Sequence, residues 1–478
     1  MSHKPRMAET PSVRLIDLKS KSNSYFIVAS VEVGNTTTKC ILTATDLEKG
    51  TTYHVVKTVR MTRDVRQPKP GEEVFGKTLT GVELSRESVA ELVKNTLLEA
   101  VKKANLDIKK DVHFVVRSTG VVAGFDAPEE VGEFIKALAD GCLMAGVPPK
   151  NMTPPMSQDN INPRFQKFSK LNKVIFDGAV ASVLPPTGAT GVEIVANEME
   201  GELATAGIKE GAKWVDVDFR NPCLSMDFGT TLDGRVISPE EPYAKTIGNF
   251  CGYAGAIPDA IIRGTQLVDL ELGTALDVFD EKPPGMITMF LKGKKIKQYA
   301  NRLMEKISIE KVPENVTRYG SVPVNPAAAA EIGVVLIGCD VGTNGSKMDE
   351  LTELGAQIYK EEGLKVLFAV IDEVMAGVIY RLVEVAQKEG VVFPETSIGV
   401  TGRAGISGDK PKLVLEKLET LGLGDKIEEK VVFVDDGLAR GAAVMARCMN
   451  SLGTPHNPLG GHTGGKCILK DRIKLQSQ

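Results

Sequence analysis

Apolar and β-branched residues alternate with turn-forming residues from residue 25 onward, in the stretch "YFIVASVEVGNTTTKCILTATDLEKGTTYHVVKTVRM". Three short runs separated by "VGNTTT" and "LEKG" predict three antiparallel strands. The spacing of apolar residues then changes from that of strands to that of a helix. "SRESVAELVKNTLLEAVKKANL" begins with Ser85 as a helix cap, carries acids early and lysines late, and therefore predicts a helix. A strand ending at Gly120 and a helix over residues 129–146 are expected next, with loops at 64–84 and 147–163.

The C-terminal half repeats this order of elements. "CLSMDFGTTLDGRVIS" predicts a second β-hairpin over residues 223–238. "VLFAVIDEVMAGVIYRLVEVAQKEG" has the spacing of a long amphipathic helix. The expected elements after it are a strand ending near Thr401, a helix over 411–422, the strand "KVVFVDD" and a helix over 437–452.

Strands and helices alternating over 478 residues predict an α/β chain with more than one core. We expect two subdomains, each a mixed sheet led by a β-hairpin and flanked by helices. The expected boundaries are a flexible segment 1–23, a first subdomain 24–221, a second subdomain 222–436 with an insertion around 262–335, a helix 437–452 packing back across the cleft between the halves, and a tail 453–478.

Composition narrows the classes of function. The net charge is −4, and the chain has one Trp and eight Tyr, so neither a basic field nor a stacking platform for nucleic acid is expected. Seven cysteines without a C-x-x-C pair indicate reduced thiols. No uncharged apolar run reaches the length of about 18 residues that a spanning helix needs. We therefore expect a cytoplasmic protein with no membrane span.

The segment "GEEVFGKT", residues 71–78, matches the phosphate-loop pattern. A working phosphate loop follows a buried strand and opens directly into a helix. Here "VRQPKP" precedes Gly71, and the predicted helix begins only near Arg86. The near-match "GGHTGGKC", residues 460–467, has no helix to open either. Lys77 is therefore predicted not to bind phosphate.

The first hairpin offers a better phosphate site. Gly34 lets the backbone approach an anion, and the residues after it supply N–H and hydroxyl groups. Glu32 stands before the turn, where it could reach a hydrated Mg²⁺. An ordinary hairpin with polar β-branched residues has the same pattern, so both readings stand for this stretch alone. The candidate phosphate residues are Gly34, Asn35, Thr36, Thr37 and Thr38.

The second hairpin has the same order of residues: strand, acid, glycine, two threonines, strand. Two such hairpins could hold one triphosphate, with Asp227 orienting the metal ion or the attacking water. A later turn of small residues would let the flat ring of adenine lie against backbone. The candidate residues are Gly229, Thr230 and Thr231 for phosphate and Gly402, Arg403, Ala404 and Gly405 for the nucleoside.

The segments "VEVGNTTTKC", "VVRSTG", "MDFGTT", "VTGRAG" and "DDGLARGAAVMA", taken in order, resemble the motifs of the actin, sugar kinase and Hsp70 ATPase superfamily. Within it, they are most similar to ATPase activators of 2-hydroxyacyl-CoA dehydratases and benzoyl-CoA reductases, and to reductive activators of corrinoid proteins. "TIGNFCGYAGAIPDAI" resembles the cysteine- and glycine-containing segment of those activators. The whole chain is similar to the archaeal family called methanogenesis marker protein 14.

The resemblance implies ATP and Mg²⁺ as ligands, with Glu32 and Asp227 near the metal. Glu32 stands where the superfamily usually has Asp, and Gly402-Arg403 stands where it usually has Gly-Gly, so the metal geometry and the base contact could both differ. The activators also hold an iron–sulfur cluster between two subunits. Cys251 fits the first cysteine position and Cys339 could fit the second, which would make the protein a homodimer.

Three functions are compatible with this resemblance. The first is an ATP-driven activator or reactivase that couples cleft closure to the maintenance of a redox, corrinoid or nickel enzyme, which would be a protein partner in methanogenesis. The second is a small-molecule kinase of the same fold. The third is a non-catalytic nucleotide-binding protein. In the first, loss of the γ-phosphate would let the cleft reopen, and the tightly packed segment around Ala442 would be where the halves lean on each other.

Overall fold

The computed structural model describes residues 4–9, 11–13, 18, 25–46, 51–119, 125, 128–152, 155–156, 174–177, 180–183, 198–239, 246–279, 286–331, 333–424 and 426–452. The chain divides into two compact units, and each is formed by more than one stretch of sequence. Unit 1 comprises Met1–Ala8, Val215–Pro239 and Thr246–Asp435. Unit 2 comprises Glu9–Trp214, Glu240–Lys245 and Asp436–Gln478.

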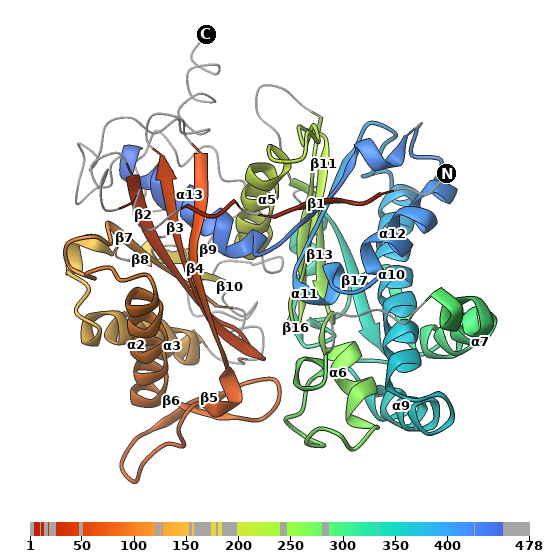
Figure 1. Cartoon of the computed structure of the whole chain (residues 1–478), viewed down its shortest axis with the longest axis horizontal. Helices are drawn as coiled ribbons and strands as arrows, with labels where there is room; N and C mark the ends of the chain where they lie inside the picture. Colours follow the sequence, from red (N-terminus) through yellow and green to blue (C-terminus); the bar gives the residue numbers. More distant parts are fainter. Residues whose placement is uncertain are drawn as a thin grey trace. The chain divides into compact units, whose positions relative to one another are not determined.

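Unit 2 is built on a four-stranded sheet (Figure 1). Its strands, in sheet order, are β4 (Thr51–Met61), β3 (Thr37–Asp46), β2 (Tyr25–Val33) and β7 (Phe114–Thr119). The pairs β2–β3 and β3–β4 are antiparallel, and β7 returns parallel to β2. The three-stranded meander expected from the sequence is thus confirmed.

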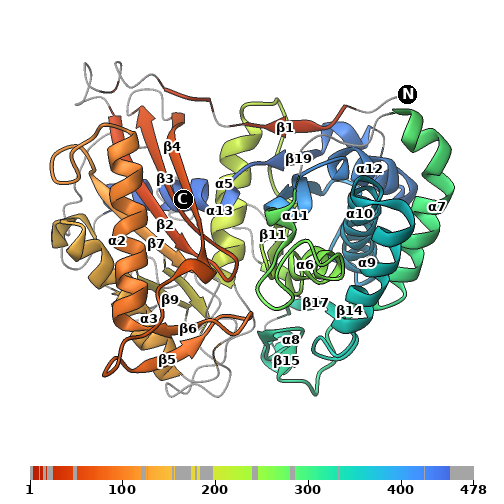
Figure 2. The same ribbon diagram turned by 60° about the horizontal axis from the view of Figure 1, so that its bottom comes forward.

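Four helices pack around this sheet: α2 (Arg86–Lys103), α3 (Pro128–Met144), α5 (Glu198–Ala212) and α13 (Gly437–Leu452). Ser85 caps α2 as expected, because its hydroxyl accepts a hydrogen bond from the backbone N–H of Ser88, and Ser88 returns the contact in a capping box. Helices α2 and α3 pack against each other, and α2 contacts β2, β3 and β4 (Figure 2).

Helices α5 and α13 cross with almost no space between their backbones. A Cβ added to Gly207 would lie 1.7 Å from the carbonyl oxygen of Gly437, and one added to Gly441 would lie 1.8 Å from that of Leu203. Only glycine fits at such a crossing. Ala442, expected to mediate contact between the halves, is fully buried in a cluster with Phe26 and other residues of unit 2.

Unit 1 is built on an eight-stranded sheet. Its strands, in sheet order, are β1 (Arg6–Ala8), β19 (Val431–Val434), β18 (Ser397–Thr401), β11 (Cys223–Phe228), β12 (Leu232–Ile237), β13 (Thr246–Gly252), β17 (Val335–Val341) and β14 (Ile307–Lys311). The hairpin β11–β12 and the pair β12–β13 are antiparallel, and β18 returns parallel to β11.

The helices of unit 1 bury one face of this sheet. They are α6 (Ala256–Arg263), α7 (Met286–Met304), α9 (Met348–Glu362), α10 (Leu364–Lys388) and α12 (Lys410–Leu418), with the short α11 (Arg403–Ile406). Apolar residues of β11, β12, β13 and β17 form the main core with them. A further short helix, α8 (Pro326–Glu331), contacts β17. The other face carries polar residues: Ser225, Asp227, Asp233, Arg235, Asn249 and Cys251.

The two units repeat one topology. In each, three consecutive strands (β2–β4 and β11–β13) form an antiparallel set, and a later strand, reached through a connection that contains helices, lies parallel to the first of the three (β2 and β7, β11 and β18). Parallel strands need a crossover connection, and that connection usually contains a helix. The fold is therefore mixed α/β, and the hairpin of each unit leads its sheet.

Two segments have more regular structure than the sequence indicated. The expected loop 64–84 contains a two-stranded sheet of β5 (Val74–Lys77) and β6 (Glu83–Ser85), which its glycines and prolines concealed. Within the N-terminal segment expected to be flexible, β1 pairs with β19 at the edge of the sheet. Three residues are too few for a periodicity signal. The expected tail 453–478 lies outside the described residues.

The remaining strands are short: β8 (Pro155–Met156), β9 (Val174–Asp177) and β10 (Val180–Val183) in unit 2, and β15 (Arg318–Tyr319) and β16 (Val322–Pro323) in unit 1. Among the helices that the structure describes, none has the length and the apolar character needed to cross a membrane.

Candidate functional site

The turn between β2 and β3 is held by hydrogen bonds that use several of the predicted phosphate groups. The Thr62 hydroxyl donates to the carbonyl of Gly34 at 2.7 Å and lies 3.0 Å from the hydroxyl of Thr38, which is fully buried. The side-chain oxygen of Asn35 accepts from the backbone N–H of Leu79 at 2.9 Å. Thr38 and Asn35 therefore stabilise the turn, whereas Gly34, Thr36 and Thr37 remain partly exposed on it.

Two lysines that the sequence reading missed lie on the same face of this sheet as Glu32. Lys39, opposite Glu32 in the hairpin, places its ammonium 3.3 Å from the Glu32 carboxylate. Lys57 on β4 contacts both carboxylate oxygens of Asp436 at 2.6 Å. Burial acts to raise the pKa of Asp436, but the ammonium groups of Lys57 and Lys39 outweigh it and hold that pKa below its usual range.

The turn between β11 and β12 is fixed by hydrogen bonds from the start of α6 and the two residues before it. The backbone N–H groups of Ala254 and Ala256 donate to the carbonyl of Thr230, and that of Gly255 donates to Gly229 at 2.7 Å. A Cβ on Gly229 would come no closer than 3.5 Å to any atom outside its chain neighbours. Gly229 is thus not required by packing, and its small size leaves the turn accessible to a ligand.

Asp227 and Asp233 face each other across the β11–β12 ladder. Directly opposed residues in an antiparallel pair have Cβ atoms about 4.5–5.5 Å apart, where like charges destabilise the pair unless a cation lies between them. Asp233 is 4% exposed and accepts a hydrogen bond from the Thr231 hydroxyl at 3.4 Å. The sequence carried this signal, because an acid stands six positions after Asp227 on the facing strand.

The predicted nucleoside turn lies directly beside this hairpin. Gly402 has φ +84°, and a Cβ there would lie 2.5 Å from the Asp227 carboxylate and 2.4 Å from the carbonyl of Phe228. Gly405 is buried against the ring of Phe228. Only glycine permits this approach and this backbone angle. Unit 1 therefore brings together Asp227, Gly229 and the turn at Gly402, while Arg403 and Ala404 stand at its surface, exposed and partly exposed.

The two candidate cluster cysteines lie on opposite faces of one sheet. Cys251 pairs with Gly338 and Cys339 pairs with Gly252, so their side chains point in opposite directions. Both thiols are fully buried, and burial raises the pKa of each well above its usual range. The described residues offer no group of three or more metal-binding side chains either. A cluster shared between subunits needs both thiolates at one surface, and the placement of these two cysteines does not fit that requirement.

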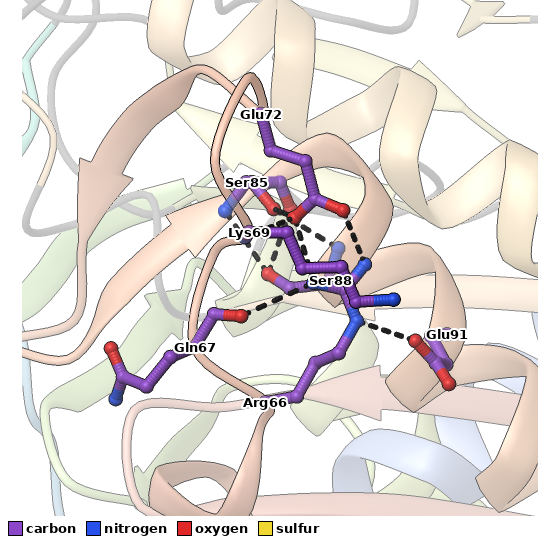
Figure 3. Close-up of polar contacts among 7 residues, drawn as sticks. All are labelled: Arg66, Gln67, Lys69, Glu72, Ser85, Ser88 and Glu91. Atoms are coloured by element: carbon purple, nitrogen blue, oxygen red, sulfur yellow. Dashed lines mark hydrogen bonds and ion pairs between the residues drawn. The ribbon is translucent and has the colours of Figure 1, made fainter.

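The segment 71–78 that matches a phosphate loop is held by ion pairs (Figure 3). Glu72 receives two hydrogen bonds of 2.7 Å from the Arg66 guanidinium and further ones from the backbone N–H of Lys69 and the hydroxyl of Ser85. Arg66 also donates to Glu91 on α2 at 2.5 Å. Lys77 is 57% exposed and pairs with Glu83 across β5–β6 at 3.0 Å. Glu72 thus connects its loop to the start of α2 through Arg66 and Ser85.

This ion pair predicts a specific dependence of stability on pH. The hydrogen bond from Arg66 lowers the pKa of Glu72 from 4.5 to about 2. A lowered pKa stabilises the folded state above the unfolded value of 4.5, and that contribution is lost as the pH falls towards about 2. We expect Glu72→Gln to lower the melting temperature at pH 7. The difference from wild type should shrink as the pH falls below about 4.5; a constant difference down to pH 2 would contradict this.

Residues 25–476 match the family described as "Uncharacterized protein conserved in archaea (DUF2114)", and the chain belongs to that family. It is 57% identical over 481 residues to the uncharacterized protein MJ1451 of Methanocaldococcus jannaschii, covering 99% of this chain and 96% of that protein. It is 58% identical over 458 residues to an uncharacterized protein of Methanothermobacter thermautotrophicus, covering 95% and 84%.

Among solved structures, a reductive activator for corrinoid, iron–sulfur protein is 12% identical, with a TM-score of 0.33. The match covers 88% of this chain, and this chain spans 60% of the length of that protein.

Proposed function

We propose that this protein binds Mg-ATP and hydrolyses it to activate a protein partner in methanogenesis. The proposal rests on a repeat between the two units: the hairpins β2–β3 and β11–β12 occupy equivalent places in their sheets. In each hairpin an acid is followed by glycine and threonines. Glycine and successive N–H groups at such a turn suit phosphate oxygens. Phosphoryl transfer needs mainly positioning and neutralisation of charge, which these residues supply.

Each group has a defined role in this proposal. In unit 1, Gly229 admits the phosphates, and the backbone at Gly402 and Gly405 admits the nucleoside. In unit 2, Gly34, Thr36 and Thr37 contact phosphate oxygens. Lys39 adds a cation there, because its ammonium already lies on the hairpin beside Glu32. Nucleotide-dependent closure of the two units stays a prediction.

The residues of unit 1 also fit a magnesium ion. Asp227 and Asp233 present two carboxylates to each other, and Mg²⁺ prefers hard oxygen ligands and commonly takes one or two protein carboxylates. These two residues would hold the ion, which would neutralise phosphate charge when bound. Glu32, the other predicted metal residue, is already compensated by Lys39 and is the weaker candidate.

The link to methanogenesis is supported by relatives from two methanogens. The experiment that tests the activator role is capture of partners from the native cell on the immobilised chain, with ATP, with ADP and without nucleotide. We expect one enzyme to bind in only one of the nucleotide states and, when purified, to raise the rate of ATP hydrolysis. Turnover of ATP with a small-molecule acceptor and no protein partner would favour a kinase instead.

Substitution of two lysines distinguishes the proposed phosphate site from the segment 71–78 that matches a phosphate loop. Lys77→Ala should leave the affinity for ATP unchanged, because Lys77 is exposed and pairs with Glu83. Lys39→Ala should weaken ATP binding about tenfold, or 1.4 kcal/mol, because it removes a cation from the hairpin. Equilibrium titration with a fluorescent ATP analogue measures both. Loss of affinity in the Lys77 variant alone would reverse the assignment.

A further inference from the structure

A buried ion pair joins α10 to the first residue of α12, beside the loop 407–409 that follows the predicted nucleoside turn. The ammonium of Lys410 lies 2.5 Å from the carboxylate of Asp372, and the two side chains are only 4% and 8% exposed. Lys410 also donates to the backbone carbonyl of Ser407 at 3.1 Å and lies 3.2 Å from its hydroxyl. All three donors of the ammonium therefore have partners.

Asp372 is tied to the same loop by its other oxygen. The backbone N–H of Asp409 donates to it at 2.8 Å. Gly408, at φ +65°, packs directly on the carboxylate, since a Cβ there would lie 2.4 Å from one of its oxygens. The Ser407 hydroxyl in turn donates to the carbonyl of Arg403 at 2.7 Å. The contacts thus run from Asp372 through Lys410 and Ser407 to Arg403, in the nucleoside turn.

The position of Asp372 is unusual for a residue that only supports the fold. It lies in the middle of α10, and it is the only charged residue among the buried residues of that helix. Burial raises its pKa, and the Lys410 ammonium opposes that rise. Replacing a buried ion pair by apolar residues of similar volume is often neutral for stability. Stability alone therefore does not require the pair, and its contacts lie with the loop 407–409.

We propose that Asp372 and Lys410 are positioning residues that hold the turn at 402–405 in the conformation that binds the nucleoside half of ATP. The inference rests on the proposed function, because it assigns the pair to the nucleotide site of unit 1. The pair touches no phosphate-binding residue. It should therefore act on the affinity for the nucleoside and leave binding of the triphosphate unaffected.

The test compares two ligands, ATP and inorganic tripolyphosphate, on the full chain. In the double variant Asp372→Leu/Lys410→Met, we expect the affinity for ATP to fall about tenfold and that for tripolyphosphate to stay unchanged. The matched control is Glu373→Leu/Lys417→Met, which removes a second ion pair between α10 and α12, of 2.7 Å, that does not touch the loop. Both ligands should bind the control as they bind wild type.

A milder variant keeps the inference testable if the double variant does not fold. Ser407→Ala removes the hydroxyl that links Lys410 to Arg403, and we expect it to weaken ATP binding about threefold while sparing tripolyphosphate. Equal losses for both ligands would show a merely structural role, and unchanged ATP affinity would overturn the inference. A wild-type protein that binds neither ligand would overturn the proposed function, and this inference with it.

Discussion

Replacement of Gly441 by valine is expected to cost unit 2 roughly 3 kcal/mol or more of its free energy of unfolding, or to prevent its folding. The reason is steric. The first side-chain atom alone would lie 1.8 Å from the carbonyl oxygen of Leu203, and backbone atoms cannot yield as a flexible side chain can. Helices α5 and α13 would have to separate and uncover their shared core. Urea unfolding, followed by the fluorescence of Trp214 in unit 2, measures the loss.

The matched control is Gly132→Ala. Gly132 lies inside α3, and an added Cβ there meets no atom within 4 Å. Because alanine is the better helix former, this variant should gain about 0.5–1 kcal/mol. If Gly441→Val unfolds at the same urea concentration as wild type, α5 and α13 do not cross as described.

The substitution Asp227→Asn is expected to slow ATP hydrolysis about 100-fold or more while leaving the fold intact. Asparagine keeps the size of the side chain but removes the charge that would hold the metal ion or orient water. Asp227 faces Asp233 and lies against Gly402, so the neutral amide stays in the same place. Measured phosphate release and circular dichroism together separate a loss of chemistry from a loss of structure.

Asp349→Asn serves as the control for charge, because Asp349 is an exposed aspartate in the first turn of α9 in the same unit. It should hydrolyse ATP at the wild-type rate. Undiminished hydrolysis in the Asp227 variant would remove this residue from the proposed site. Asp233→Asn should show a smaller loss of the same kind.

The elements could be predicted from the sequence where the apolar pattern extends over many residues and where turn-forming residues mark its ends. The three-stranded meander, the hairpin at β11–β12 and the helix at 437–452 follow from local patterns. Strand β1 could not be predicted, because its three residues become a strand only through pairing with β19, far away in the sequence. The pair β5–β6 was hidden by the glycines and prolines around it.

The candidate site was predicted less completely, because its parts depend on register. That Asp233 faces Asp227, and Lys39 faces Glu32, follows only when the residues of each hairpin are paired. The sequence also did not show which of the candidate side chains are buried. Asn35 and Thr38 have groups that could bind phosphate, but these groups form hydrogen bonds that stabilise the turn from within. For the cysteines, spacing along the chain concealed that adjacent strands direct Cys251 and Cys339 to opposite faces.

The central claim, that the two hairpins bind the phosphates of ATP, is tested most directly by calorimetric titration of wild type and Gly229→Val with Mg-ATP and Mg-ADP. The nearest atom to a Cβ at Gly229 is 3.5 Å away, so the variant should fold normally and block only an approaching ligand. The account predicts that wild type binds ATP more tightly than ADP, and that the variant loses about tenfold or more of the ATP affinity. No binding of ATP by wild type, or equal binding by both proteins, would contradict it.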